Sequence, residues 1–129
     1  MNTILVEVSV GELLDKISIL EIKKEKIKDS EKLKFINDEY EVLKDQLDKN
    51  VKSDEKIDKL FQSLKEINSK LWIIEDDKRL CEKNSDFSEK FIKLSRDVHF
   101  LNDNRAKIKL EINHHTGSKI KEIKEYTNY

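Results

Sequence analysis

The side chains of this sequence that are best suited to chemistry are carboxylates and arginines placed along helical patterns. Glu21, Glu75 and Asp97 fall at similar heights on three predicted helices, and each lies beside an apolar position. Arg79 is near enough in height to pair with them, and Trp72, which also fits a core position, lies one turn before Glu75. Helical bundles build di-metal and Mg²⁺ sites from carboxylates on facing helices. This set is therefore a candidate binding cluster, although in a chain with 41% charged residues the same spacing is also typical of ordinary salt bridges.

Arg105 is the second candidate, because it occupies a position in an otherwise apolar helical seam. A buried guanidinium without a partner is too costly to persist, so it needs a carboxylate, a bound anion or an oligomer partner. By height along the helices, the expected carboxylates are Glu25, Asp29 or Glu31. An arginine at the edge of the core that reaches water is the simpler alternative. If the residue instead contacts an anion, we expect it to share that contact with polar residues on the same or an adjacent face: Asn102, Lys109 and Asn113.

Complete catalytic motifs cannot be read in the sequence. It contains no Gly-rich phosphate loop, no His-Glu-x-x-His metal motif and no Ser-His-Asp order. The adjacent His114 and His115 point about 100° apart on a helix, so they do not chelate one metal together. Cys81 and His99 lack an orienting third group, and a buried thiol is the simpler interpretation of Cys81. We predict neither a metal ion nor a cofactor, and whether the chain is an enzyme stays open at this stage.

Length and composition predict the framework that must position these residues. The 129 residues fit a single domain, 1–129. Only 36% of the residues are hydrophobic, but the net charge of −1 argues against disorder driven by charge. The sequence has no proline and only two glycines, so it has few residues suited to the turns of a sheet or of a loop-built fold. We therefore predict an all-α, elongated protein.

The hydrophobic pattern predicts a short extended segment and then an antiparallel bundle of three long helices. Apolar residues alternate over 4–10, as in a short N-terminal strand, and Ser9 with Glu12 forms a capping box at a helix start. Gly117 is expected to stop the last helix. Short connections predict an up-down-up arrangement. The three predicted helices are residues 10–49 with a disturbance near 28–30, residues 54–82 and residues 86–115.

Four blocks of the sequence resemble an uncharacterised family of small bacterial helical proteins, a domain of unknown function. The blocks are VSVGELLDKISILEIK (8–23), LWIIEDDKR (71–79), LNDNRAKIK (101–109), and Ile112-Asn113 with Thr116-Gly117-Ser118. The resemblance implies a helical protein and supplies no activity. It draws attention to the polar residues inside the blocks: Glu12, Asp15, Lys16, Glu21, Trp72, Glu75, Arg79, Asn102, Asp103, Arg105 and Asn113.

Location and partners follow from composition. One cysteine favours a reducing cytoplasm, and no apolar run is long enough for a membrane span. Balanced charge makes nucleic acid an improbable partner. A thin helical rod buries little surface alone, so we expect a homodimer, with a further protein partner conceivable. We favour a non-enzymatic helical interaction or scaffold protein; the alternative is a small-molecule or metal-dependent enzyme that uses the inter-helix carboxylate and arginine cluster.

Overall fold

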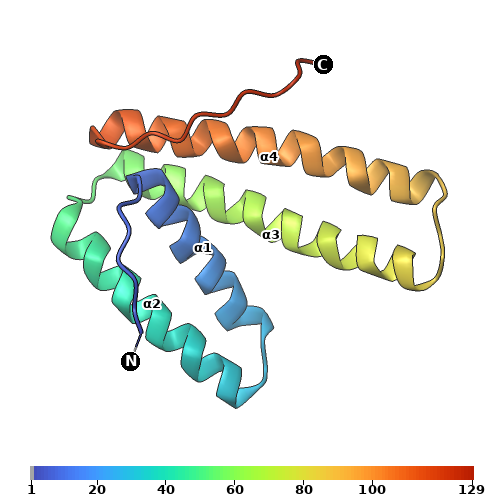
Figure 1. The fold of residues 1–129 in the computed structure, drawn as a ribbon, viewed down its shortest axis with the longest axis horizontal. Helices are drawn as coiled ribbons and strands as arrows, with labels where there is room; N and C mark the ends of the chain where they lie inside the picture. Colours follow the sequence, from blue (N-terminus) through green and yellow to red (C-terminus); the bar gives the residue numbers. More distant parts are fainter. Residues whose placement is uncertain (1) are drawn as a thin grey trace.

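The computed structural model describes residues 2–129, and it is all-α, as predicted (Figure 1). Four helices follow one another along the chain: α1 (Val10–Lys26), α2 (Ser30–Asn50), α3 (Glu55–Lys83) and α4 (Glu89–Thr116). Helix α1 packs against each of the other three, and α3 packs along α4. No helix within residues 2–129 carries an apolar stretch long enough to cross a membrane. The prediction of three helices is therefore wrong in number, although the boundaries of the last two agree within three residues.

The extra helix arises because the disturbance near residues 28–30 is a complete chain reversal. Helix α1 ends at Lys26, and the backbone of Ile27 is extended. Asp29 then caps α2, its side chain accepting a hydrogen bond of 3.0 Å from the backbone nitrogen of Lys32. A capping carboxylate at this position starts a new helix rather than bending an old one. Helices α1 and α2 consequently form a helical hairpin. Of the other three helices, α2 packs along α1 alone.

The predicted N-terminal strand is wrong for the described residues of that segment, and Met1 lies outside them. Residues 2–9 form no strand, and Ile4, Leu5 and Val6 are largely exposed. A strand needs a neighbour to satisfy its backbone groups, and residues 2–129 contain no second strand. The alternating apolar pattern therefore has no sheet to join.

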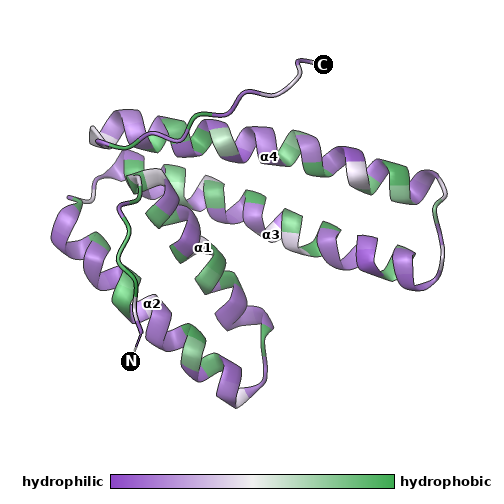
Figure 2. Ribbon diagram, viewed as in Figure 1, coloured by the Kyte–Doolittle hydropathy of each residue, from purple (hydrophilic) through white to green (hydrophobic). Residues whose placement is uncertain are grey.

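Helices α3 and α4 form a hairpin, and we call the half of it away from their connecting loop the proximal half. The hydrophobic core lies where α1 crosses this proximal half. One buried cluster here consists of Leu14, Ile57, Leu64 and Ile112, with partly buried side chains packed around it: Val10, Leu47, Val51, Leu60, Phe61 and Ile108. Ile17, Leu20 and Ile22 are also buried along α1. Figure 2 shows apolar and polar positions interleaved along every helix. Farther along the hairpin, within residues 70–100, only Cys81 is buried. The core is thus concentrated at one end of the molecule.

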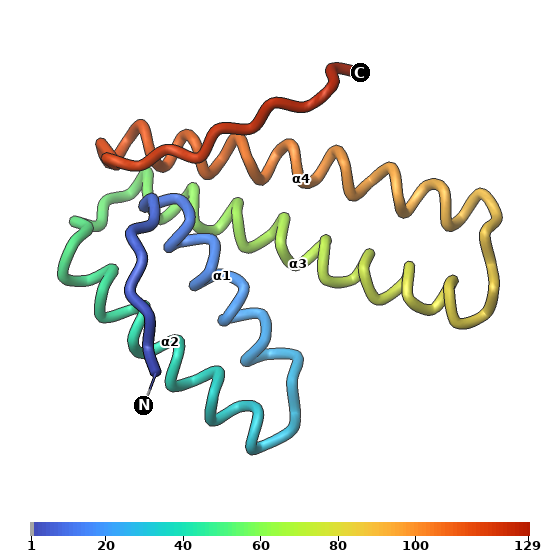
Figure 3. The backbone as a smooth tube through the Cα atoms, viewed as in Figure 1, coloured from blue at the N-terminus to red at the C-terminus, as the bar shows by residue number. Residues whose placement is uncertain are grey.

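The last helix ends as the sequence predicts. Gly117 adopts a left-handed backbone with φ of 66°, and the backbone nitrogen of Ser118 donates to the carbonyl of Asn113 at 2.9 Å. Glycine adopts this conformation without steric cost, which explains the stop at this position. Residues 118–129 then run extended across α4 towards the middle of that helix (Figure 3). The C-terminal segment is therefore brought beside polar side chains of α4.

Candidate functional site

The start of α1 and the end of α4 are joined by an unusually close contact. The backbone nitrogen of Gly11 donates to Asn113 Oδ1 at 2.7 Å, and that of Val10 donates to Ser118 Oγ at 3.2 Å. A Cβ atom on Gly11 would lie 2.5 Å from the carbonyl oxygen of Lys109, so only glycine fits here. The side chains of α4 and of the turn after it thus satisfy backbone groups that a helix start leaves free.

The predicted capping box is half correct. Ser9 Oγ accepts from the backbone nitrogen of Glu12 at 3.1 Å, as expected. The carboxylate of Glu12, however, pairs with Lys109 at 2.6 Å. Glu12 is therefore turned outward from its own helix, and its charge becomes part of an inter-helix cluster.

Asp15, in the second turn of α1, is the most deeply buried charged group of this cluster, with its side chain 1% exposed. Arg105 donates to both of its carboxylate oxygens, with Nε at 3.0 Å from Oδ1. Asn68 Nδ2 donates to the same Oδ1 at 2.9 Å and to Ser18 Oγ at 2.8 Å. The hydrogen bonds to Asp15 raise the pKa of Arg105 above its ordinary value, despite the opposing effect of burial. This carboxylate is thus held by α3 and α4 together.

The structure corrects the predicted partner of Arg105, which is Asp15 and not Glu25, Asp29 or Glu31. The heights used in the prediction assumed that the first and last helices run parallel. Because the chain reverses at residues 27–29, α1 instead runs opposite to α4. Gly11 accordingly meets Asn113, and Asp15 meets Arg105.

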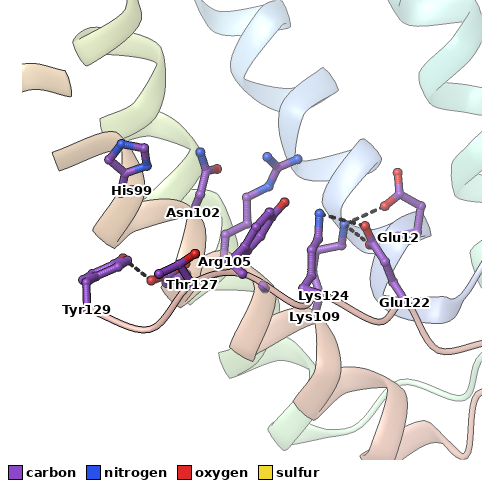
Figure 4. A pocket seen from close by; sticks show the side chains of 12 residues that line it. Glu12, His99, Asn102, Arg105, Lys109, Glu122, Lys124, Thr127 and Tyr129 are labelled. Atoms are coloured by element: carbon purple, nitrogen blue, oxygen red, sulfur yellow. Dashed lines mark hydrogen bonds and ion pairs between the residues drawn. The ribbon is translucent and has the colours of Figure 1, made fainter. Parts of the chain in front are cut away.

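Lys109 is the second cation of the cluster and is nearly enclosed, with its side chain 10% exposed. Its Nζ lies 2.6 Å from Glu12, 2.9 Å from Glu122 and 3.8 Å from Asp15 (Figure 4). Burial alone lowers the pKa of Lys109, but the carboxylates around it have the larger combined effect and raise it. Lys109 is therefore a charged ammonium that joins α1, α4 and the C-terminal segment.

Two contacts attach the C-terminal segment to α4 beyond that of Lys121 Nζ with His114 Nδ1, at 3.4 Å. Glu122 pairs with Lys109, and it also pairs with Lys124 at 3.0 Å. Hydrogen bonds from these two lysines lower the pKa of Glu122 to about 2. At the chain end, the hydroxyl of Tyr129 donates to Asp103, and its ring meets that of Phe100 edge-on with centroids 5.5 Å apart.

A cavity of about 790 Å³ lies between these two attachment points, α4 and the start of α1. Its charged lining balances three cations, Arg105, Lys109 and Lys124, against the three carboxylates of Glu12, Asp103 and Glu122. Apart from Ala106, the rest of the lining is polar or aromatic: His99, Asn102, Tyr126, Thr127 and Tyr129 (Figure 4). We call this space the α4 cleft. It can bind charged or polar groups, and a paired carboxylate already occupies one edge of it.

Comparison with known families agrees with the four sequence blocks. The model of a family of unknown function (DUF6165) matches residues 4–129. The chain belongs to this family. No curated protein and no solved structure matches it. DUF6165 membership thus covers nearly the whole chain, including every residue of the α4 cleft, and it brings no activity with it.

The sequence candidates of this DUF6165 chain separate into two groups. Asn102, Arg105 and Lys109 line the α4 cleft, and Asn113 lies behind it, hydrogen-bonded to Gly11. The others lie apart from the cleft. Glu21 is held by Lys65 at 3.1 Å.

The remaining candidates lie on the hairpin of α3 and α4. Asp97 pairs with Lys93 at 2.7 Å along α4. Glu75 and Arg79 are exposed, and Trp72 is half-buried on α3. Within residues 2–129, no group of three or more His, Cys, Asp or Glu side chains is arranged to hold a metal ion.

Four residues of the cluster were not predicted as binding candidates: Glu12, Asp15, Asn68 and Glu122. Glu12 and Asp15 carried a signal, because both lie inside the first recognisable block. Asn68 is four residues after the core residue Leu64 and shares its face, which makes it a polar residue at a buried position. Glu122 carried no signal, since it is one charge among many in a charged segment.

Proposed function

We propose that this chain is a non-enzymatic helical interaction protein that forms a homodimer through the distal half of the α3/α4 hairpin, residues 70–100. The observation that carries the proposal is the set of apolar side chains that this distal hairpin leaves uncovered. Ile73, Leu80, Phe87 and Ile92 are each more than half exposed. Ile73 and Leu80 are seven residues apart and so share one face of α3, and apolar side chains grouped on an exposed face mark protein interaction sites.

A pair of helices buries only the seam between them, in the manner of a short coiled coil. In the proximal half, α1 covers one face of the hairpin, and buried core residues result. No helix within residues 2–129 covers the distal half in the way that α1 covers the proximal half. A depression of about 390 Å³ lies there, lined by Ile73, Ile74, Phe100 and Leu101. A second helical pair laid on this face would complete a four-helix bundle.

Charge complementarity favours a second copy of the chain as the partner. An acidic run, Glu75-Asp76-Asp77, lies in the distal half of α3, and three cations, Lys90, Lys93 and Arg96, lie in the distal half of α4. A two-fold axis that places α3 of one copy against α4 of the other brings these opposite charges together. A cytoplasmic location fits the proposal, since the single cysteine, Cys81, is a buried free thiol.

The enzyme alternative has less support from the geometry. It required Glu21, Glu75 and Asp97 to converge with open carboxylates. Glu21 is instead paired with Lys65, and Asp97 is paired within α4. The interaction hypothesis therefore remains our proposal.

Sedimentation equilibrium of the wild-type chain and of two variants tests the proposal. We expect a wild-type mass of twice 15.3 kDa at micromolar concentration. Ile73→Glu and Leu80→Glu, which place charges on exposed positions, should each give a folded monomer. Val42→Glu is the matched control, because Val42 is equally exposed but lies on α2. A monomeric wild type, or a dimer that withstands both hairpin variants, would refute the proposal.

A further inference from the structure

We infer that the α4 cleft is a binding site for a small molecule that carries a carboxylate or phosphate group, and that this group takes the place of Glu122 on Lys109. The inference is separate from the proposed dimer, because Lys109 and Glu122, the pair on which it rests, lie outside residues 70–100. It rests on which of the two carboxylates around Lys109 can leave.

Glu12 and Glu122 bind the same ammonium group but differ in how they are anchored. Glu12 belongs to the first turn of α1, which is fixed by the buried contact of Gly11 with Asn113. Glu122 belongs to an extended segment in which no residue from 119 to 129 is buried or half-buried. Glu122 can therefore leave Lys109 together with its segment without disturbing core packing, whereas the backbone of Glu12 is fixed in α1.

When Glu122 leaves, Lys109 keeps one carboxylate within hydrogen-bond distance, Glu12, and exposes an N–H group to the cleft. Lys124, which Glu122 also binds, becomes free at the same time. Arg105 offers little further attraction, since Asp15 takes hydrogen bonds from both its Nε and one terminal nitrogen. The cleft thus has room for one anionic group, for which carboxylate and phosphate are the chemically matching classes.

The rest of the cleft fits the body of a small polar ligand. Its volume of about 790 Å³ lies within the ordinary range of small-molecule sites, about 300–1,000 Å³. His99 and Asn102 supply hydrogen-bonding groups, and Tyr126 supplies an aromatic face. His99 and Asn102 lie along α4 beyond Arg105 as seen from Lys109, so a ligand anchored at Lys109 can extend towards them (Figure 4). Tyr126 belongs to the C-terminal segment.

Titration of the ¹⁵N-labelled full chain with inorganic phosphate, and separately with succinate, tests the site by amide chemical shifts at constant ionic strength. We expect saturable shifts confined to residues 99–109 and 118–129. Glu122→Gln removes the internal competitor and should tighten binding about three- to fivefold, the range expected for loss of a partly exposed ion pair. Glu125→Gln is the matched control, because it makes the same charge change on an exposed neighbour in the same segment.

The outcomes are distinct. Saturation by phosphate alone assigns a phosphorylated ligand, and saturation by succinate alone assigns a carboxylic acid; either supports the site. Lys109→Met, which keeps the buried stem of the side chain, should abolish binding while circular dichroism remains helical. Absence of saturable shifts in both the wild type and Glu122→Gln would overturn the inference. An equal gain in Glu125→Gln would also overturn it, because the effect would then be one of overall charge.

Discussion

Replacing Arg105 with alanine should destabilise the protein by about 3 kcal/mol. The substitution removes both donors that Arg105 gives to Asp15, whose carboxylate is 1% exposed. Breaking a fully buried ion pair in this way costs about 3 to 5 kcal/mol. Three features place the cost at the lower end: Arg105 itself is 29% exposed, Asn68 still donates to Asp15, and Lys109 lies 3.8 Å away. Water entering the vacated space can hydrate the carboxylate only in part.

Urea denaturation followed by helical circular dichroism measures this effect. With a slope of about 1.5 kcal/mol per molar urea, typical of a small domain, the midpoint should fall by about 2 M. A domain with about 5 to 15 kcal/mol of stability stays folded without urea after this loss. Arg79→Ala is the control, since Arg79 is an exposed arginine on α3 and its removal should change the free energy of unfolding by less than about 0.5 kcal/mol.

A double-mutant cycle with Asp15→Asn separates the ion pair from lost packing. The amide keeps the shape of Asp15 and removes its charge, so the double variant has neither a stranded carboxylate nor a stranded guanidinium. We expect it to be about 2 kcal/mol more stable than the sum of the two single effects predicts. Additive effects, or an Arg105→Ala variant as stable as the Arg79→Ala control, would refute the account of Arg105 as the partner that makes burial of Asp15 tolerable.

Two further predictions concern the contacts of α4 with its neighbours. Gly11→Ala should lower the free energy of unfolding by about 1 to 3 kcal/mol, because the new methyl group would meet the carbonyl oxygen of Lys109 at 2.5 Å. Helix propensity alone predicts the opposite, a stabilised variant. A variant more stable than the wild type in urea would therefore contradict the close contact. Acidification should release the C-terminal segment: the pKa of Glu122 is about 2 in the folded chain and ordinarily 4.5, so its stabilising effect is complete above about pH 4.5 and is lost as the pH falls towards 2. Since Glu122 is 41% exposed, the effect should be at most about 1 kcal/mol, and the amide shifts of residues 118–129 should contain a titration step in this range in the wild type that is missing in Glu122→Gln.

Features that depend on neighbours in sequence were predictable. The composition predicted an all-α chain, and seams with steps of three and four residues placed the last two helices within three residues of α3 and α4. Gly117 and the serine half of the Ser9 cap were also predicted correctly. At the start of α4, Ser88 is the residue that precedes the helix, and Asp86 accepts from the backbone nitrogen of Ser88 at 3.1 Å. Both residues suit a cap, so the sequence did not distinguish them.

Features that depend on the direction of a helix were not predictable. Lys28-Asp29-Ser30 fits either a kink or a reversal, and the apolar pattern before and after it is compatible with both. That one ambiguity determined which residue faces Arg105, so the need for a carboxylate partner was inferred correctly and its identity was wrong. The pairing of Lys109 with Glu122 depends on how an extended segment crosses α4, for which the sequence has no periodic signal.

The polar cluster draws residues from three of the four recognisable sequence blocks, 8–23, 101–109 and the block around Asn113, and none from block 71–79. An apolar seam of leucine and isoleucine specifies that two helices pack, but sliding one helix by a turn replaces each apolar contact with a similar one. The contacts of Gly11 with Asn113 and of Asp15 with Arg105 and Asn68 have no such substitute, because a slide by one turn would leave a buried carboxylate and a buried amide unpaired. We therefore expect the register of α1 on α4 to be fixed by these polar pairs. The same register holds Glu12 on Lys109. The geometry of the α4 cleft therefore depends on polar contacts that lie behind it, such as that of Gly11 with Asn113.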